Sequence, residues 1–314
     1  SLMSLLCSCC ENLGCNWFTF LLAIVVWICV KKVMPRRLKS VDGDVVLITG
    51  GGGDLGKLFA KRFLVRGATV ILWDVNEAGL KDAVEMLTKY GRVHSYICDI
   101  SNRETVYAVA KRVEKEVGEV TILVNNAAIM PAQEFFKLRD EVLEKTIAIN
   151  TTAHFWTVKA FVPQMIKRNS GHVVCIASSA GFVSVPRLAE YCASKAGAAH
   201  FAESLRHELR MSNATGVRVT TVAPYAVNTA LAAGWKDSIW MKLCGLSLLD
   251  PEHVADMTVE GTLANEHLIF IPRHIKVFWL VRILLPVWLQ DRLVMALGGD
   301  HLLDSFSGRG KALH

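Results

Sequence analysis

The sequence predicts a doubly wound α/β fold built on a parallel sheet. From Asp44 onward, short apolar segments alternate with longer amphipathic ones. This alternation is typical of parallel strands connected by helices that cover both faces of the sheet. The short segments are apolar almost throughout, as expected for strands buried on both faces. The chain has 314 residues, enough for one such domain with attachments.

Each element follows from this alternation. Strands are expected at residues 45–49, 69–73, 95–98, 122–125, 172–177 and 217–223. Helices are expected between them, for example at Leu55–Val65, Arg103–Val117 and Thr151–Lys167. No internal repeat or low-complexity linker divides this region. We therefore predict a single domain over residues 41–270.

The N-terminal segment has a different character. Residues 17–30 carry no charge, and counting back to Leu13 gives a stretch close to the roughly 20 residues that span a bilayer. Basic residues begin at Lys31 and Lys32, directly after it, and should stay on the cytosolic side. A signal peptide would carry its positive charge before the apolar run. We predict that residues 1–40 form an uncleaved membrane anchor with a basic flank, and a half-inserted hairpin remains an alternative.

The C-terminal residues 271–314 form an apolar and basic extension. The apolar run at 277–290 is interrupted by Arg282 and Pro286, so it is poorly suited to crossing a bilayer. Apolar faces combined with basic residues suit the interface of a membrane. Packing on the protein's own core, or on a second subunit, is the other interpretation.

Composition excludes some classes of function. The net charge is +6 and mean hydropathy is +0.33, and no basic stripe with interleaved aromatic residues appears. We therefore expect a membrane or lipid-droplet surface as a partner and no nucleic acid. Neither the cysteines nor the histidines have metal-ligand spacing, so no metal site is predicted.

A glycine-rich turn follows the first expected strand, at residues 49–56. Glycines at a strand-to-helix turn let the backbone approach a pyrophosphate, and the helix N-terminus offers N–H groups to it. The second strand ends at Asp74, whose carboxylate can accept hydrogen bonds from ribose hydroxyls and would repel a 2′-phosphate. The pattern therefore favours NAD over NADP.

Tyr191 and Lys195 are spaced to share one face of a predicted helix. An ammonium near a phenol favours the phenolate form, so the tyrosine could exchange a proton with an alcohol. This helix follows a buried strand that ends at Ser178. Asn150 ends another segment. The four residues together indicate a candidate catalytic site.

Taken in order, these motifs resemble the classical short-chain dehydrogenases/reductases over about residues 41–230. The resemblance implies a Rossmann-like fold and an NAD-dependent oxidoreductase. It implies that Tyr191 is the general base, Ser178 holds the substrate oxygen, Lys195 lowers the tyrosine pKa, and Asn150 helps hold a water in the proton relay. The cofactor-binding residues that it implies, several of them already described, are Thr49, Gly50, Gly53, Asp54, Leu55, Gly56, Asp74, Asp99, Ile100, Asn126, Ala127, Tyr191, Lys195, Pro224 and Thr229.

The finer resemblance is to the membrane-bound branch with epidermal-type retinol dehydrogenases and 17-beta-hydroxysteroid dehydrogenases. It is carried by residues 122–127, 159–161, 191–195 and 304–308. It implies oxidation of a hydrophobic alcohol, first of all all-trans-retinol, with hydroxysteroids and fatty alcohols as alternatives. It also implies the endoplasmic reticulum membrane or a lipid droplet as location, with the catalytic domain facing the cytosol. A homodimer is left open.

Three positions depart from the family pattern. Ala128 and Tyr225 replace glycines, and Asp54 stands where the family has the second glycine of the turn. A carboxylate there lies near an anionic pyrophosphate and competes for N–H groups that the phosphate needs. A non-catalytic membrane or lipid-droplet protein with weakened cofactor binding is therefore the competing hypothesis. The resemblance also implies that residues 225–250, with Trp235, Trp240 and Met241, cover the substrate. Ordinary packing of these side chains is the other interpretation.

Overall fold

The computed structural model describes residues 37–298. The predicted anchor and the 304–308 motif lie outside the described residues, apart from the last few residues of the basic flank. Of the described residues, those from Lys39 to Gly298 belong to one compact unit. Among the described residues, none of the helices combines the length and the apolar character that crossing a bilayer requires.

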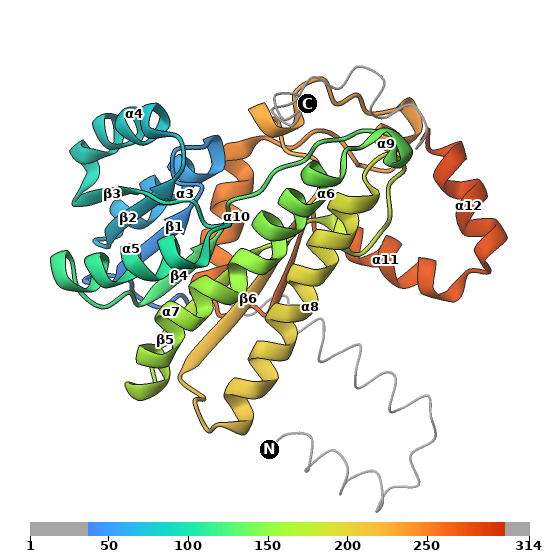
Figure 1. Ribbon diagram of the computed structural model, residues 1–314. Coiled ribbons are helices and arrows are strands. Elements are labelled where there is room, and N and C mark those ends of the chain that lie inside the picture. Colours follow the sequence, from blue (N-terminus) through green and yellow to red (C-terminus); the bar gives the residue numbers. More distant parts are fainter. Residues whose placement is uncertain (1–36, 299–314) are drawn as a thin grey trace, which may run out of the picture. The chain divides into compact units, whose positions relative to one another are not determined.

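A seven-stranded sheet forms the centre of this unit, in the order β3-β2-β1-β4-β5-β6-β7, with every pairing parallel (Figure 1). The predicted fold class is confirmed. The strands are β1 Val45–Thr49, β2 Thr69–Asp74, β3 Val93–Ile97, β4 Ile122–Asn125, β5 Gly171–Ile176, β6 Val217–Pro224 and β7 Leu268–Ile271. The first six match the expected segments within two residues, whereas β7 was not predicted.

Ten α-helices are described between and after the strands (Figure 1). They are α3 Asp54–Leu64, α4 Glu77–Leu87, α5 Arg103–Glu116, α6 Asp140–Ile147, α7 Ala153–Lys167, α8 Ala189–Met211, α9 Ile239–Leu243, α10 Pro251–Leu263, α11 Ile275–Leu284 and α12 Val287–Ala296. A π-helical turn, Ala148–Thr152, separates α6 from α7.

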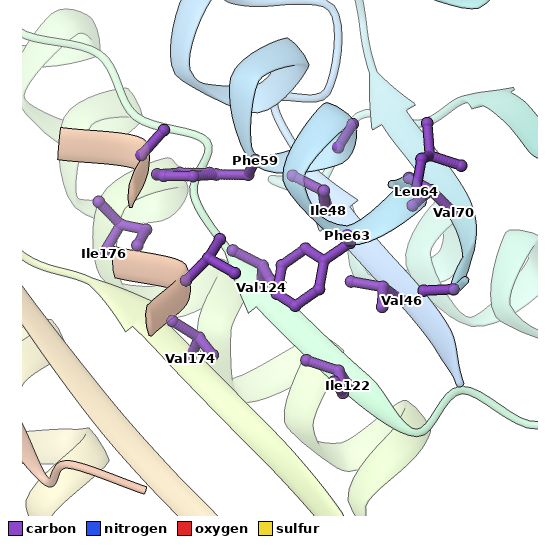
Figure 2. Close-up of a cluster of buried hydrophobic side chains, with 14 of the residues drawn as sticks. Val46, Ile48, Phe59, Phe63, Leu64, Val70, Ile122, Val124, Val174 and Ile176 are labelled. Carbon is purple, nitrogen blue, oxygen red and sulfur yellow. The ribbon is translucent and has the colours of Figure 1, made fainter. Parts of the chain in front are cut away.

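The two faces of the sheet carry separate hydrophobic cores because alternate residues of each strand point in opposite directions. On one face, Phe59 and Phe63 of α3 lie against strand residues such as Ile48 and Val124 (Figure 2), and α4 and α10 complete the layer. On the other face, α5, α7 and α8 cover residues such as Leu47. The buried strands predicted from their apolar sequences therefore lie between two helical layers.

The direction in which the chain adds strands to the sheet reverses between β1 and β4. From β1 the chain adds β2 and β3 on one side, and then crosses to add β4, β5, β6 and β7 on the other. A crevice forms outside the carboxyl ends of the strands at such a switch point, and ligands of doubly wound sheets bind there.

Candidate active site

A cavity of about 550 Å³ opens at the carboxyl ends of the strands. This size lies in the range of ligand pockets in proteins. The predicted site residues that line it are Gly50, Gly53, Asp54, Leu55, Gly56, Asp74, Asp99, Ile100, Asn126, Ala127, Ser178, Tyr191, Lys195, Pro224 and Thr229. Thr49 and Asn150 are buried and lie outside the lining.

The glycine-rich turn allows very close approach between backbone segments. Gly50 has φ +65°, and a Cβ atom there would lie 2.9 Å from the Cα atom of Ala127. A Cβ atom on Gly56 would lie 2.2 Å from the carbonyl oxygen of Gly50. Only glycine can occupy these two positions while α3 begins directly against the turn.

Thr49 supports the turn from behind. Its Oγ1 accepts hydrogen bonds from the backbone N–H groups of Asn126 (3.0 Å) and Ala127 (3.1 Å). The Asn126 side-chain amide donates in return to the Thr49 carbonyl oxygen at 2.9 Å. These bonds join the ends of β1 and β4. Thr49 is therefore a positioning residue rather than a direct contact.

The cavity fits a dinucleotide. The N-cap residue of α3 is Gly53, which has no side chain to accept hydrogen bonds from the first N–H groups of the helix. Such groups at a helix N-terminus bind phosphate. At the neighbouring strand ends, Asp74 accepts the N–H of Gly52 at 3.0 Å through one carboxylate oxygen. Asp99 also lines the cavity, and its carboxylate is held by Ser101.

Asp54 behaves differently from the sequence-based expectation. Its carboxylate does not cap the helix and instead accepts a hydrogen bond from the backbone N–H of Ala230 at 2.8 Å. Ala230 belongs to the segment after β6, so Asp54 links the start of α3 to that segment. The expected competition for the helix N–H groups is therefore absent, although the negative charge remains at the edge of the cavity.

We expect Asp54→Asn to bind NAD about five-fold more tightly than the wild type, because the amide oxygen can still accept from Ala230 while the charge is removed. One unit charge about 4 Å away is worth about 1 kcal/mol in a solvent-like environment. Asp54→Gly removes both the charge and the link, so comparing the two variants separates their effects. Calorimetric titration with NAD at low and high salt measures this, and unchanged affinity in Asp54→Asn would show that the charge is irrelevant.

Tyr191, Ser178 and Lys195 meet in the cavity as the sequence predicts. The Nζ of Lys195 lies 5.8 Å from the centre of the Tyr191 ring and donates a hydrogen bond to the Ile176 carbonyl oxygen at 2.7 Å. Burial raises the pKa of Tyr191 to about 12, and a hydrogen bond with Ser178 acts in the opposite direction. Burial is the largest of these effects, so the pKa of Tyr191 lies above its ordinary value in this structure.

Burial also lowers the pKa of Lys195 to about 8. Below pH 8 the folded and unfolded chains both carry the lysine proton, and burying that charge destabilises the fold. Between pH 8 and the ordinary lysine pKa of 10.5 the unfolded chain binds more protons, so stability rises with pH.

We therefore expect Lys195→Met to be inactive yet no less stable than the wild type at pH 7. The lowered pKa of Lys195 means that burying the charged lysine costs roughly 3 kcal/mol at pH 7. Methionine avoids this cost, and part of the gain offsets the lost hydrogen bond to the Ile176 carbonyl oxygen. Thermal unfolding at pH 7 and pH 10 measures the difference. The advantage of the variant should shrink as pH rises, and an advantage that grows instead would contradict this assignment.

Asn150 lies in the π-helical turn, a distortion frequent at functional sites. Its side chain accepts from the Ile129 N–H at 2.9 Å and donates to the Ile129 carbonyl at 2.9 Å and to the Ser194 hydroxyl at 3.0 Å. Ser194 in turn donates to the Tyr191 carbonyl oxygen at 2.8 Å. Asn150 thus fixes α8 relative to the cavity without lining it. Sequence reasoning missed Ser194, although it stands inside the Tyr191–Lys195 motif.

Beyond the Tyr191 hydroxyl, the cavity wall is largely apolar. Its residues there come from the segments that follow β4, β5 and β6, and they are Met130, Ala180, Val185, Leu188, Leu231, Ala232 and Trp235. Of the three residues expected to cover the substrate, Trp235 lines the cavity and Met241 packs behind it, whereas Trp240 is 58 % exposed and lies outside. Apart from Trp235, no period or motif marks these residues, so sequence reasoning did not find them.

Comparisons with known proteins agree with this geometry. Residues 44–240 match the family model described as short chain dehydrogenase. Estradiol 17-beta-dehydrogenase 11 of Pongo abelii is 41% identical over 82% of this chain and 84% of its own. Epidermal retinol dehydrogenase 2 of Homo sapiens is 38% identical over 96% of both chains.

The fold comparison points the same way. A short chain dehydrogenase/reductase from Burkholderia phymatum, solved in complex with NAD, superimposes with a TM-score of 0.68 at 28% identity, covering 76% of this chain and 92% of that one. Together with the Tyr191, Ser178 and Lys195 geometry, these matches show that the chain belongs to the short-chain dehydrogenase family of oxidoreductases.

Proposed function

We propose that the protein oxidises a hydrophobic alcohol to its carbonyl with NAD, and that all-trans-retinol is the principal substrate. The observation that carries this proposal is the position of the Tyr191 and Ser178 hydroxyls between the phosphate-binding turn and an apolar cavity wall. An alcohol that enters this wall has its hydroxyl directed to the two residues able to bind it. The names of the two relatives, a retinol dehydrogenase and an estradiol dehydrogenase, support the same class of substrate.

The choice of NAD rests on charge. Asp74 stands at the end of β2, where a carboxylate accepts hydrogen bonds from the adenosine ribose and repels a 2′-phosphate. Within the described part of the chain, Lys195 is the one lysine or arginine that lines the cavity, and it lies at the Tyr191 end. No basic side chain in that lining is available to neutralise a 2′-phosphate.

The chain's own residues divide the chemistry. NAD supplies the hydride acceptor when bound. Ser178 positions the alcohol oxygen, and the phenolate form of Tyr191 accepts the proton of the alcohol hydroxyl at Oη. Since burial raises the pKa of Tyr191 to about 12, oxidation is expected to accelerate as the pH rises. Lys195 contributes positive charge beside the phenol while it is protonated, with its pKa near 8. Asn150 and Ser194 hold α8 in place for these steps.

NADH formation by detergent-solubilised protein tests the proposal. All-trans-retinol, estradiol and a long-chain fatty alcohol are each supplied with NAD or with NADP. We expect the highest kcat/KM with retinol and NAD, and at least a ten-fold preference for NAD, the effect of about 1.4 kcal/mol. Higher turnover with NADP, or no turnover of any alcohol, would contradict it.

We further propose that α11 and α12 rest on a lipid surface of the endoplasmic reticulum or a lipid droplet, with the active site facing the cytosol. Trp279 packs against Phe182 and Phe270, and Arg282 donates to the Phe182 carbonyl, which attaches α11 to the domain. The opposite side is apolar and exposed, with Leu284 at 83 % and Trp288 at 61 % exposure.

Lys276 lies in α11 and Arg292 in α12, where the Arg292 guanidinium lies 5.7 Å from the centre of the Trp288 ring. Basic charge beside an apolar helix face favours anionic lipid. A fluorescent amino acid placed at position 284 of the full chain reports the contact. Its emission should shift to the blue on anionic vesicles, while the same probe at Met211, which is also exposed, should not shift. Equal emission shifts at positions 284 and 211 would contradict the proposal.

A further inference from the structure

A carboxylate outside the catalytic group organises the segment that covers the cavity. Asp237 accepts two hydrogen bonds through Oδ1, from the Tyr225 hydroxyl at 3.1 Å and from the Trp235 indole N–H at 2.9 Å. Its Oδ2 accepts the backbone N–H of Leu248 at 2.7 Å. Asp237 thus joins the residue after β6, the aromatic wall and the far end of the covering segment.

Both aromatic partners belong to the cavity wall. Tyr225 and Trp235 line the cavity and contact each other edge to face, with ring centres 5.9 Å apart. Burial and the nearby Asp237 carboxylate raise the pKa of Tyr225, so its hydroxyl keeps its proton and remains a donor. A second acceptor, the Sδ of Met241, lies 3.3 Å from the hydroxyl, but an ionised carboxylate is the stronger partner.

The consequence concerns what the wall offers to a substrate. A tyrosine and a tryptophan in a pocket usually present polar handles to a ligand. Here the Tyr225 hydroxyl and the Trp235 indole N–H both donate to Asp237, which itself does not line the cavity. The wall therefore presents aromatic carbon, while the side-chain hydroxyls at the reacting end come from Ser178, Ser179 and Tyr191.

We propose that Asp237 is a specificity-determining residue that withdraws the donors of Tyr225 and Trp235 from the pocket, so that the site selects alcohols with a single polar end and rejects those with a second oxygen. This inference rests on the proposed function, since it names the substrate class of the same site. A second hydroxyl of the substrate that reaches this wall loses its hydrogen bonds to water and finds no new partner. This loss weakens binding about ten-fold or more.

The test compares fatty alcohols with the α,ω-diols of the same chain lengths, as substrates with NAD and as ligands in equilibrium dialysis. The wild type should prefer the mono-alcohol by about ten-fold or more at chain lengths that reach the wall. Asp237→Ala should lose most of this preference, because it frees both donors. Adding Tyr225→Phe to Asp237→Ala should restore part of it, because one freed donor is removed again.

Asp250→Ala is the matched control. It removes another hydrogen-bonded carboxylate near the end of the same segment, at the N-cap of α10, and should keep the wild-type preference. Asp237→Ala could instead lower turnover and binding of mono-alcohols and diols alike, or adding Tyr225→Phe could restore none of the preference for mono-alcohols. Either result would show that Asp237 is merely structural and that the inference is wrong. Wild-type protein that turns over no alcohol refutes the proposed function instead, and dialysis still decides the selectivity.

Discussion

Tyr191→Phe is expected to lower kcat/KM for the alcohol by about 100-fold to 10,000-fold, the usual contribution of a positioned acid–base group. The phenyl ring fills the same space, so the buried packing around position 191 is retained. Only the hydroxyl that accepts the substrate proton is lost. Steady-state NADH formation measures the effect, and fluorescence titration with NAD should show cofactor affinity close to that of the wild type.

A matched variant separates loss of chemistry from loss of structure. Tyr96 in β3 is also buried and also makes a hydrogen bond, donating to Glu116 at 2.8 Å, but it lies outside the cavity. Tyr96→Phe should therefore retain activity within a few-fold of the wild type. Unchanged turnover in Tyr191→Phe would remove the tyrosine from the mechanism.

Gly56→Ala is expected to disrupt the cofactor turn. The added Cβ atom would lie 2.2 Å from the Gly50 carbonyl oxygen and 2.8 Å from the Gly51 Cα atom, so α3 or the turn must move. Overpacking of this kind costs about 1–3 kcal/mol, and the displaced turn should also weaken NAD binding by more than ten-fold. Thermal unfolding and calorimetric titration measure the two effects.

Gly53→Ala in the same turn provides the comparison. Gly53 has φ −85°, and its nearest contact for an added Cβ is the Gly50 carbonyl oxygen at 3.3 Å. The stability of this variant should stay within about 0.5 kcal/mol of the wild type, as for substitutions without a severe clash. If both alanine variants unfold at the same temperature, the close approach at Gly56 is not the reason for its glycine.

The sequence predicted the sheet well, and also that Tyr191 and Lys195 face one cavity, because these signals are local. Buried parallel strands are apolar in themselves, and Tyr191 and Lys195 share a helix face through spacing alone. The turn at residues 49–56 likewise shows its function in its glycines. These features depend little on partners far away in the chain.

The parts that the sequence missed depend on distant contacts. β7, Leu268–Ile271, has only four residues and is defined by its pairing with β6. Asp54 was expected to bind its own helix, yet its partner, Ala230, is 176 residues away. Thr49 was expected to bind the cofactor, yet its side chain holds the backbone of Asn126 and Ala127 behind the turn. Residue type could not distinguish these roles, because they are decided by where the side chain finds its partner.

The most direct test of the account follows the hydrogen that leaves the substrate. Detergent-solubilised protein is given NAD and all-trans-retinol in which both hydrogens on the carbinol carbon are replaced by deuterium, and the recovered cofactor is analysed by mass spectrometry. The account predicts one deuterium in each reduced nicotinamide that the wild type produces, and formation of labelled cofactor at least 100-fold slower with Tyr191→Phe. Retinal formation without label in the cofactor, or labelled cofactor at wild-type rates from the variant, would contradict it.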